Sequence, residues 1–383
     1  MNPFNFSLPL EIFFGKGELA RLPEAAKNLK TEHAFIISDP GIKKMGIAGK
    51  CEDMLKAQGI KVSGFYDTEA NPSVETVERA AEEYRKSGAD TIVAVGGGSS
   101  IDVAKAAGVL VKYGGKITDY EGPDKVPGKI VPFIAIPTTA GTGSEVTASA
   151  VITDHKRNYK FTVFSYKQLP DYAILDPELI TTAPASLAAA CGIDAFIHAE
   201  ESYISKAASP YSEAMSEKAM ELIGRSIRRF VADRSDMAAA EDMLAGSLFA
   251  GIAFARARLG DVHSMSHPVS AYHNVPHGVA NAIILPTVAR FNAIVDNGKY
   301  IKIYNYISPE KADEESFKSD MLAEAFAKLN REIGIPSSLR EVGVTDEFIE
   351  EMAEDAMKSG NTPVNPRETT KEDFITLYRE CLG

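Results

Sequence analysis

The sequence contains no tryptophan, only three cysteines and fewer basic than acidic residues. Three cysteines (Cys51, Cys191 and Cys381) cannot build a disulfide framework, and so sparse a count is typical of a reducing compartment. The 41 Lys and Arg against 53 Asp and Glu give a net charge of −12, which argues against a nucleic-acid partner. No uninterrupted apolar run approaches the roughly 18 residues that cross a bilayer, and the N-terminus has no signal-peptide pattern. We therefore expect a cytoplasmic protein without membrane contact.

The length of 383 residues exceeds what one hydrophobic core usually spans, so two domains are expected. In the first half, short apolar runs alternate with helical patterns, and this alternation predicts a parallel sheet covered by helices. The strand-like runs lie at 34–38, 91–95, 130–137, 148–154, 159–164 and 172–177. The runs at 148–154 and 159–164 predict a hairpin. Helical patterns dominate after residue 183, so we expect an α/β domain over 1–183 and a helical domain over 184–383.

A glycine-rich segment, Gly96 to Ser99, lies between a strand-like run and a helical pattern. Glycines at this point let backbone N–H groups approach a phosphate, and the helix N-terminus favours its negative charge. The dinucleotide fingerprint is incomplete, because Ile101 stands where a third glycine would fall. A plain tight turn is the alternative interpretation.

Three further features of the first half fit a nucleotide site. Asp39 follows a strand-like run, where a carboxylate can bind ribose hydroxyls and repel a 2′-phosphate, which favours NAD over NADP. A role as a turn residue before Pro40 explains Asp39 equally well. Asp102 lies in the first turn of the helical pattern and either caps the helix or belongs to the cofactor site. The hydroxyl-rich loop 138–144 can bind a nucleotide or form an ordinary turn.

A cluster of histidines marks the second half. Asp194 and His198 are four residues apart in a helical pattern, so their side chains share one face. His263 and His267 repeat this spacing, and His277 follows. Three histidines and an aspartate could bind a divalent ion that keeps an open position for a substrate oxygen, and surface histidines gathered by chance are the alternative. Imidazole and carboxylate suit Fe²⁺, Zn²⁺, Mn²⁺ and Co²⁺ alike.

A nucleotide domain beside a divalent metal suggests hydride transfer between NAD and an alcohol or aldehyde. Four segments together resemble the iron-dependent (group III) alcohol dehydrogenase family, within it the lactaldehyde reductase, 1,3-propanediol dehydrogenase and butanol dehydrogenase group. The segments are GGGSSIDVAK (96–105), IPTTAGTGSEVT (136–147), GIDAFIHAEESYIS (192–205) and HSMSHPVSAYHNVPHGVANAIILP (263–286). The resemblance implies a Rossmann-like nucleotide-binding α/β domain followed by an all-α metal-binding domain, an architecture like that of dehydroquinate synthase. It also implies NAD(H), one Fe²⁺ (with Zn²⁺ as the alternative), a short-chain aldehyde or primary alcohol as substrate, and a homodimer.

The resemblance also assigns roles to residues by position. The implied metal ligands are Asp194, His198, His263 and His277, and His267 matches a family histidine that assists proton transfer without binding the metal. The implied cofactor-binding residues are Asp39, Asn71, Gly97, Gly98, Ser99, Thr138, Thr139, Thr142, Thr147 and Lys160. Asp102 is counted with them because of its place in the helical pattern after the glycines.

The chain departs from its relatives around the histidine cluster. Arg256 and Arg258 stand where relatives tend to carry Asn and a small residue, and His273 lies in a pair of positions that are usually aromatic. We hypothesise that an arginine binds an anionic end of the substrate, as in sulfoacetaldehyde or succinic semialdehyde, with His273 as a further candidate contact. Pairing of the arginines with Asp261 or Glu200 is the alternative. A neutral lactaldehyde or 1,3-propanediol type of substrate and a lyase like dehydroquinate synthase are the alternative functions.

Overall fold

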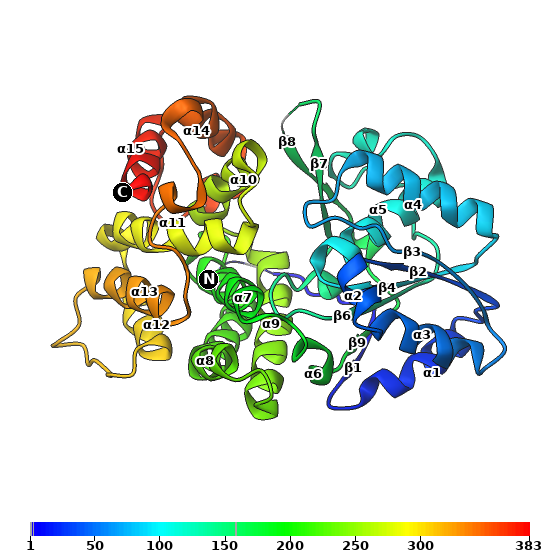
Figure 1. The fold of residues 1–383 in the computed structure, drawn as a ribbon. Coiled ribbons are helices and arrows are strands. Elements are labelled where there is room, and N and C mark those ends of the chain that lie inside the picture. Colours follow the sequence, from blue (N-terminus) through cyan, green and yellow to red (C-terminus); the bar gives the residue numbers. More distant parts are fainter. Residues whose placement is uncertain (1, 3, 158) are drawn as a thin grey trace. The chain divides into compact units, whose positions relative to one another are not determined.

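The computed structural model describes residues 2, 4–157 and 159–383 (Figure 1). The chain divides into two compact units. The α/β unit comprises Phe6–Thr139 and Gly143–Thr182. The helical unit comprises Ala183–Gly383 and also includes Ala140–Thr142 and the described residues before Phe6. The main division thus falls between residues 182 and 183, whereas we expected it between 183 and 184.

The core of the α/β unit is a six-stranded parallel sheet with the order β1-β9-β6-β4-β2-β3. The strands are β1 (Glu11–Phe14), β2 (His33–Ser38), β3 (Lys61–Phe65), β4 (Thr91–Gly96), β6 (Phe133–Pro137) and β9 (Tyr172–Leu175). The four inner strands are those expected from apolar runs. The edge strands β1 and β3 are partly exposed, so neither has the continuous apolar run of a strand buried on both faces.

The expected hairpin forms a second, separate sheet. Strands β7 (Ser149–Asp154) and β8 (Tyr159–Phe164) pair antiparallel, and the two-residue strand β5 (Gly122–Pro123) pairs with β8. The hairpin is therefore confirmed, but it does not extend the main sheet.

Helices cover both faces of the main sheet (Figure 1). Phe35, Ile92 and Phe133 lie in the core that includes α4 (Val74–Ser87) and α5 (Gly98–Tyr113). The next residue along each of these strands lies instead in the opposite core, with α1 (Leu22–Asn28) and α3 (Ile47–Lys56). Because alternate side chains of a strand point to opposite faces, burial on both faces explains the unbroken apolar runs. The remaining helices of this unit are α2 (Pro40–Lys44) and α6 (Pro177–Ile180).

The strand order places a topological switch point between β2 and β4. The chain runs from β2 outward to β3 and then returns to continue on the other side through β4, β6 and β9. Ligands of open parallel sheets bind at the carboxyl ends of the strands beside such a switch. Asp39 follows β2, Gly97 follows β4 and Thr138 follows β6, so three predicted cofactor residues share this edge.

The helical unit contains long helices joined by short connections. Its helices are α7 (Ala185–Ile204), α8 (Pro210–Ala232), α9 (Met237–Ala257), α10 (Asp261–His273), α11 (His277–Asn292), α12 (Tyr300–Ile307), α13 (Asp320–Glu332), α14 (Ile349–Lys358) and α15 (Lys371–Leu382). Helices α7, α8 and α9 pack against one another, and α11 packs against α7, α10 and α13. Short 3-10 turns of the chain lie at Glu18–Arg21, Ile117–Tyr120, Ser144–Val146, Tyr166–Gln168, Ala293–Val295, Arg340–Val342, Asp346–Phe348 and Thr362–Val364.

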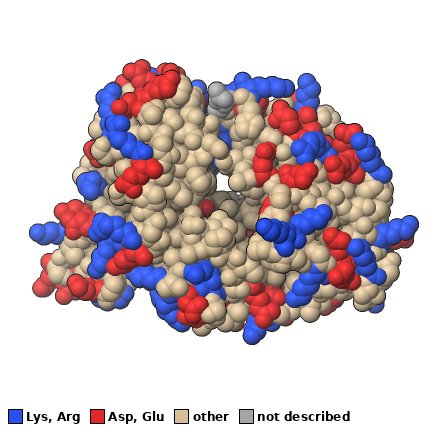
Figure 2. Space-filling view, viewed as in Figure 1, with Lys and Arg blue, Asp and Glu red and all other residues tan. Residues whose placement is uncertain are grey.

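Two helical segments are long and apolar enough to cross a membrane by length and composition, although neither contains an uninterrupted apolar run of that length. They are Met237–Ala257 and His277–Val295. Buried positions make up 56% of the first apolar window and 50% of the second. Core helices of globular proteins have the same composition, and here both helices pack against neighbours in the helical unit. On the face drawn in Figure 2, acidic and basic side chains are interspersed rather than gathered into a basic stripe.

Candidate active site

One face of helix α7 carries three buried polar residues. Asp194, His198 and Glu201 are spaced by four and three residues, so their side chains lie above one another on the same face. Relative exposures of 3%, 4% and 2% show that all three are removed from solvent. Buried charges of this kind need partners, and the partners come from two other helices.

The neighbouring helices begin beside this face of α7. His263 is the third residue of α10, and His277 is the first residue of α11. Helix α11 can start this close because Gly278 has no side chain: a Cβ atom there would collide with the backbone carbonyl of Ala190 on α7. The glycine after His277 in the sequence therefore has a packing reason.

The three histidines converge on a single oxygen atom. Asp194 Oδ1 lies 3.8 Å from Nε2 of His198, 3.6 Å from Nε2 of His263 and 3.9 Å from Nε2 of His277. Ligand atoms held about 2.1 Å from a tetrahedral metal ion are about 3.4 Å apart, so these separations are close to a tetrahedral set. Asp194, His263 and His277 form a group whose ligand atoms all lie within 4.8 Å of one another. A carboxylate and two imidazoles therefore fit a divalent cation, and His198 adds a third imidazole near the same carboxylate oxygen.

Asn281 shows that the lone pairs of this group point to one place. Its Nδ2 lies 2.6 Å from Asp194 Oδ1, 3.1 Å from His263 Nε2 and 3.0 Å from His277 Nε2. All three neighbours are positioned to accept a hydrogen bond from the amide, and a cation would use the same acceptor lone pairs. The Oδ1 atom of Asn281 is buried without a hydrogen-bond partner among the described residues.

The charges of the site reinforce this arrangement. Burial raises the pKa of Asp194, but the facing histidines lower it by more, so the pKa falls far below its usual value. Burial lowers the pKa of His198 to about 4, and its Nδ1 donates a hydrogen bond of 3.2 Å to the carbonyl of Gly141. For His263, burial lowers the pKa, and the carboxylates of Glu201 and Asp194 raise it by more, to about 9. A charged Asp194 beside a neutral His198 is the protonation pattern that metal ligands require, whereas the raised pKa of His263 means that its ring must release a proton when an ion binds.

The other candidate residues around this cluster take different positions. The His267 ring lies 5.2 Å from the ring of His277 and 6.0 Å from that of His263, beside the predicted ligands. Phe254 of α9 stacks on His198 with ring centroids 4.5 Å apart. The ring of His273 lies 5.9 Å from that of Phe348 instead. The role of His273 as a substrate-binding residue therefore stays a prediction, because its ring packs on Phe348 and not on the histidine cluster.

The two unusual arginines interact outside the cluster. Arg258 adopts a left-handed backbone conformation after α9, and its guanidinium donates a hydrogen bond of 3.2 Å to the carbonyl of Gly360. Arg256 is half-buried and lies close enough to Tyr211 to lower its pKa, against the larger effect of burial. Oδ2 of Asp261, one of the partners considered for these arginines, accepts a hydrogen bond of 2.5 Å from Thr369.

The α/β unit brings most of the predicted cofactor residues to the carboxyl edge of its sheet. Asp39 caps α2 with Oδ1, which accepts a hydrogen bond of 3.0 Å from Ile42 N, so its role as a turn residue is real. Its Oδ2 faces Gly96: a Cβ atom added to this glycine would lie 3.3 Å from Oδ2. Helix α5 begins at Gly98 without a side-chain cap, which leaves its N–H groups for an anion. The buried hydroxyl of Thr138 has no partner among the described residues. These features fit a dinucleotide.

Asp102 and Thr147 point into the unit instead. Both oxygens of Asp102 accept hydrogen bonds, from Ser144 Oγ at 2.5 Å and from Val151 N at 2.9 Å. The fully buried Lys105 donates hydrogen bonds to Ser144 Oγ, to the carbonyl of Thr147 and to the carbonyl of Ser149, at 2.9, 2.9 and 2.7 Å. This network supports the loop that follows β6. Thr142 belongs to the helical unit.

Lys160 and Asn71 are joined by a hydrogen bond of 2.8 Å from Lys160 Nζ to Asn71 Oδ1. Burial lowers the pKa of Lys160 to about 8. The ammonium group is therefore charged below about pH 8 and neutral above it. If its charge contributes to NADH binding, the dissociation constant of NADH rises about fivefold between pH 7 and pH 9.5, because a charge-assisted hydrogen bond becomes a neutral one. Fluorescence titration of NADH measures this change.

The matched variants for this test are Lys160→Met and Lys86→Met. Lys160→Met is expected to bind NADH more weakly at pH 7 and to lose the pH dependence. Lys86 is exposed on α4, and its replacement leaves both properties unchanged. Equal NADH affinity of the parent protein at the two pH values would contradict a role for the charge.

Glu201, Asn281 and Phe254 touch the histidine cluster and are not among the site residues predicted from the sequence. Glu201 continues the spacing of Asp194 and His198, and Asn281 lies four residues after His277, so helical periodicity was an available signal for both. Phe254 had no such signal, because an aromatic residue in an apolar helix usually belongs to the core.

Comparison with known proteins gives a consistent result. The model of the iron-containing alcohol dehydrogenase family matches residues 9–177, and the model of the C-terminal region of that family matches residues 188–382. The chain is 38% identical to 1,3-propanediol dehydrogenase of Citrobacter freundii, covering 99% of both chains. It is 37% identical to lactaldehyde reductase of Escherichia coli strain K12, covering 96% of both chains.

A solved structure agrees with these matches. The sulfoacetaldehyde reductase of Bifidobacterium kashiwanohense, solved in complex with NAD⁺, superposes with a TM-score of 0.88 at 31% identity, over 100% of this chain and 99% of the other. The resemblance seen in the sequence is confirmed, as is the predicted fold class. The chain is an oxidoreductase that belongs to the iron-containing alcohol dehydrogenase family.

Proposed function

We propose that the protein interconverts a short-chain aldehyde and its primary alcohol, with NAD(H) as the hydride carrier and Fe²⁺ as the metal. The convergence of three imidazole Nε2 atoms on Asp194 Oδ1 carries the proposal. Zn²⁺ is the alternative metal, since the donor set suits both ions. The carboxylate of Asp39 at the switch point favours NAD(H) over NADP(H), because it would repel a 2′-phosphate.

In this proposal each group has a defined task. A divalent ion in the histidine cluster supplies Lewis acidity toward a carbonyl oxygen. Asp194, His198, His263 and His277 would hold it, and burial of the first three side chains limits the access of competing water. A ring nitrogen of His267 holds or releases the alcohol proton. The His267 ring can do so because it lies beside the predicted metal ligand His277. NADH supplies the hydride.

A panel of short aldehydes, neutral and anionic, tests the function. Purified protein reconstituted with Fe²⁺ should oxidise NADH with at least one aldehyde of the panel and use NADPH less efficiently. Removal of the metal by a chelator should abolish turnover, and Fe²⁺ should restore it. Turnover that persists without metal, or an absence of NADH oxidation with every aldehyde, would contradict the proposal.

An anionic substrate is the second candidate, and the similarity to a sulfoacetaldehyde reductase favours it. The half-buried Arg256 and the exposed Arg258 are the candidate anion-binding groups. If either one binds the substrate, its replacement by Ala lowers kcat/KM for sulfoacetaldehyde or succinic semialdehyde by about 10- to 100-fold and leaves that for propanal unchanged. Equal losses with charged and neutral aldehydes would eliminate this candidate in favour of a neutral hydroxyaldehyde or diol.

The lyase alternative is not favoured, because both family models that match are those of alcohol dehydrogenases. Consumption of NADH in a single turnover with an aldehyde separates the two chemistries. We also propose a cytoplasmic homodimer. The free cysteines support a reducing compartment, cell fractionation tests the location, and light scattering of the purified protein measures the mass of the assembly.

A further inference from the structure

We infer that Glu201 is a positioning residue of the metal site: its carboxylate fixes the ring orientation and the tautomer of His263. The inference rests on the metal-binding part of the proposed function. Glu201 lies on α7 three residues after His198, and it is 2% exposed. It faces the predicted ligands but does not belong to the group around Asp194 Oδ1.

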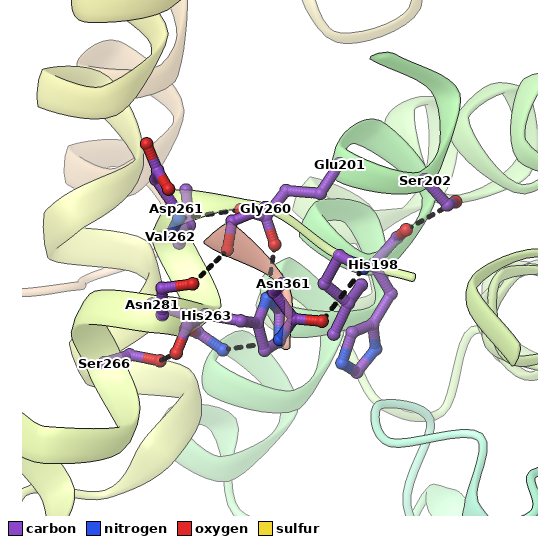
Figure 3. Close-up of polar contacts among 12 residues, drawn as sticks. His198, Glu201, Ser202, Gly260, Asp261, Val262, His263, Ser266, Asn281 and Asn361 are labelled. Carbon is purple, nitrogen blue, oxygen red and sulfur yellow. Dashed lines mark hydrogen bonds and ion pairs between the residues drawn. The ribbon is translucent and has the colours of Figure 1, made fainter. Parts of the chain in front are cut away.

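The carboxylate of Glu201 makes two hydrogen bonds to the start of α10 (Figure 3). Oε2 lies 2.5 Å from His263 Nδ1, and Oε1 accepts a hydrogen bond of 2.7 Å from the backbone N–H of Val262. An ionised carboxylate only accepts hydrogen bonds, so Nδ1 of His263 must carry the proton. The Nε2 atom then offers its lone pair toward Asp194 Oδ1, 3.6 Å away.

The backbone around this contact leaves the carboxylate little freedom. A Cβ atom at Gly260 would lie 2.9 Å from Glu201 Oε1 and 3.0 Å from Asn365 Oδ1, so only glycine lets both side chains approach. Asn365 Oδ1 accepts a hydrogen bond of 3.3 Å from Asp261 N, and Asn361 Oδ1 accepts one of the same length from Leu259 N. The chain entering α10 is therefore held by Asn361, Asn365 and Glu201, and of these three side chains Glu201 is the one that also contacts His263.

Glu200 provides a matched comparison on the same helix. It is also 2% exposed, yet among the described residues it makes no hydrogen bond to His263. Replacing either glutamate by glutamine removes a buried carboxyl group without changing its size. Only at position 201 does the replacement alter the partner of a predicted metal ligand.

The glutamine of Glu201→Gln cannot satisfy both contacts. With its NH₂ group toward His263, the amide requires an unprotonated Nδ1 and so places the proton on Nε2, where it blocks the lone pair. With its NH₂ group toward Val262, two donors face each other. We therefore expect the dissociation constant for Zn²⁺, measured by competition with a chromogenic chelator, to rise about 10- to 100-fold. Glu201→Asp keeps a carboxylate, so its dissociation constant for Zn²⁺ should rise less. The dissociation constant of Glu200→Gln should stay within about threefold of that of the parent protein.

A spectroscopic measurement separates positioning from a general loss of stability. In the Zn²⁺-loaded parent protein with ¹⁵N-labelled histidine, the Nδ1–H proton of His263 should appear far downfield because of its short hydrogen bond to a carboxylate. Glu200→Gln should keep this resonance, and Glu201→Gln at saturating Zn²⁺ should lose it or shift it upfield. Circular dichroism checks that the variants fold, and Glu201→Asp carries the test if Glu201→Gln does not fold.

The outcomes distinguish the inference from the function. Equal Zn²⁺ affinity of Glu201→Gln and Glu200→Gln, or an unchanged His263 resonance in Glu201→Gln, would overturn the positioning role alone. A parent protein that binds no divalent ion would overturn the metal site and this inference together.

Discussion

Asp194→Asn is expected to abolish divalent-metal binding and to lower kcat/KM for aldehyde reduction by at least about 1000-fold. Asp194 Oδ1 is the atom on which three Nε2 atoms converge, so the amide removes the negative charge at the centre of the site. A metal supplies several kcal/mol of transition-state stabilisation, and each 1.36 kcal/mol corresponds to a tenfold change in rate. Metal content after dialysis and steady-state kinetics with NADH measure the two effects.

The control for this variant is Glu200→Gln, which removes a buried carboxyl group six residues later on the same helix. This control should retain metal and activity. If Asp194→Asn kept both a full equivalent of metal and more than about a tenth of the parental activity, the ion would not be held at this atom and the proposed centre would be wrong.

Lys105→Met should destabilise the α/β unit by about 3–5 kcal/mol. Lys105 is fully buried and donates to the carbonyls of Thr147 and Ser149, which would lose this partner. Its Nζ also lies 4.0 Å from Asp102 Oδ1, and removal of the cation leaves that carboxyl group without the nearby positive charge. Burial already lowers the pKa of Lys105 to about 8 and raises that of Asp102. Calorimetry should show the unfolding transition about 6–20 °C lower.

Two further variants show whether this loss comes from the buried charge. Lys86→Met removes an exposed ammonium group and should shift the transition by no more than about 1–2 °C. Adding Asp102→Asn to Lys105→Met should recover part of the loss, because the uncompensated carboxylate is then gone. An unchanged transition temperature in Lys105→Met would show that the buried network contributes little to stability.

The apolar pattern identified the buried parts of the fold best. The inner strands β2, β4, β6 and β9 have unbroken apolar runs because helices cover both of their faces. The edge strands β1 and β3 lack such runs, and their place in the sheet follows from hydrogen bonding to a neighbouring strand, which is the distant β9 for β1 and the preceding β2 for β3. The pairing partner of a strand is not encoded in its own periodicity, which is why the hairpin was predicted but its separation from the main sheet was not.

Within the candidate site, local spacing in the sequence determined which residues share a helix face, and tertiary packing determined which helices meet. The sequence by itself determined the pairs on one helix face, such as Asp194 with His198, because the period of the helix places residues four apart together. Only the tertiary structure decided that His263 and His277 meet Asp194 while His273 lies against Phe348, since this depends on how α10 and α11 are rotated against α7. The same packing brought Glu201 to His263, while contacts inside the α/β unit, with Ser144 and Val151, turned Asp102 inward. Contacts between helices depend on orientation and close approach, which no local pattern along the chain specifies.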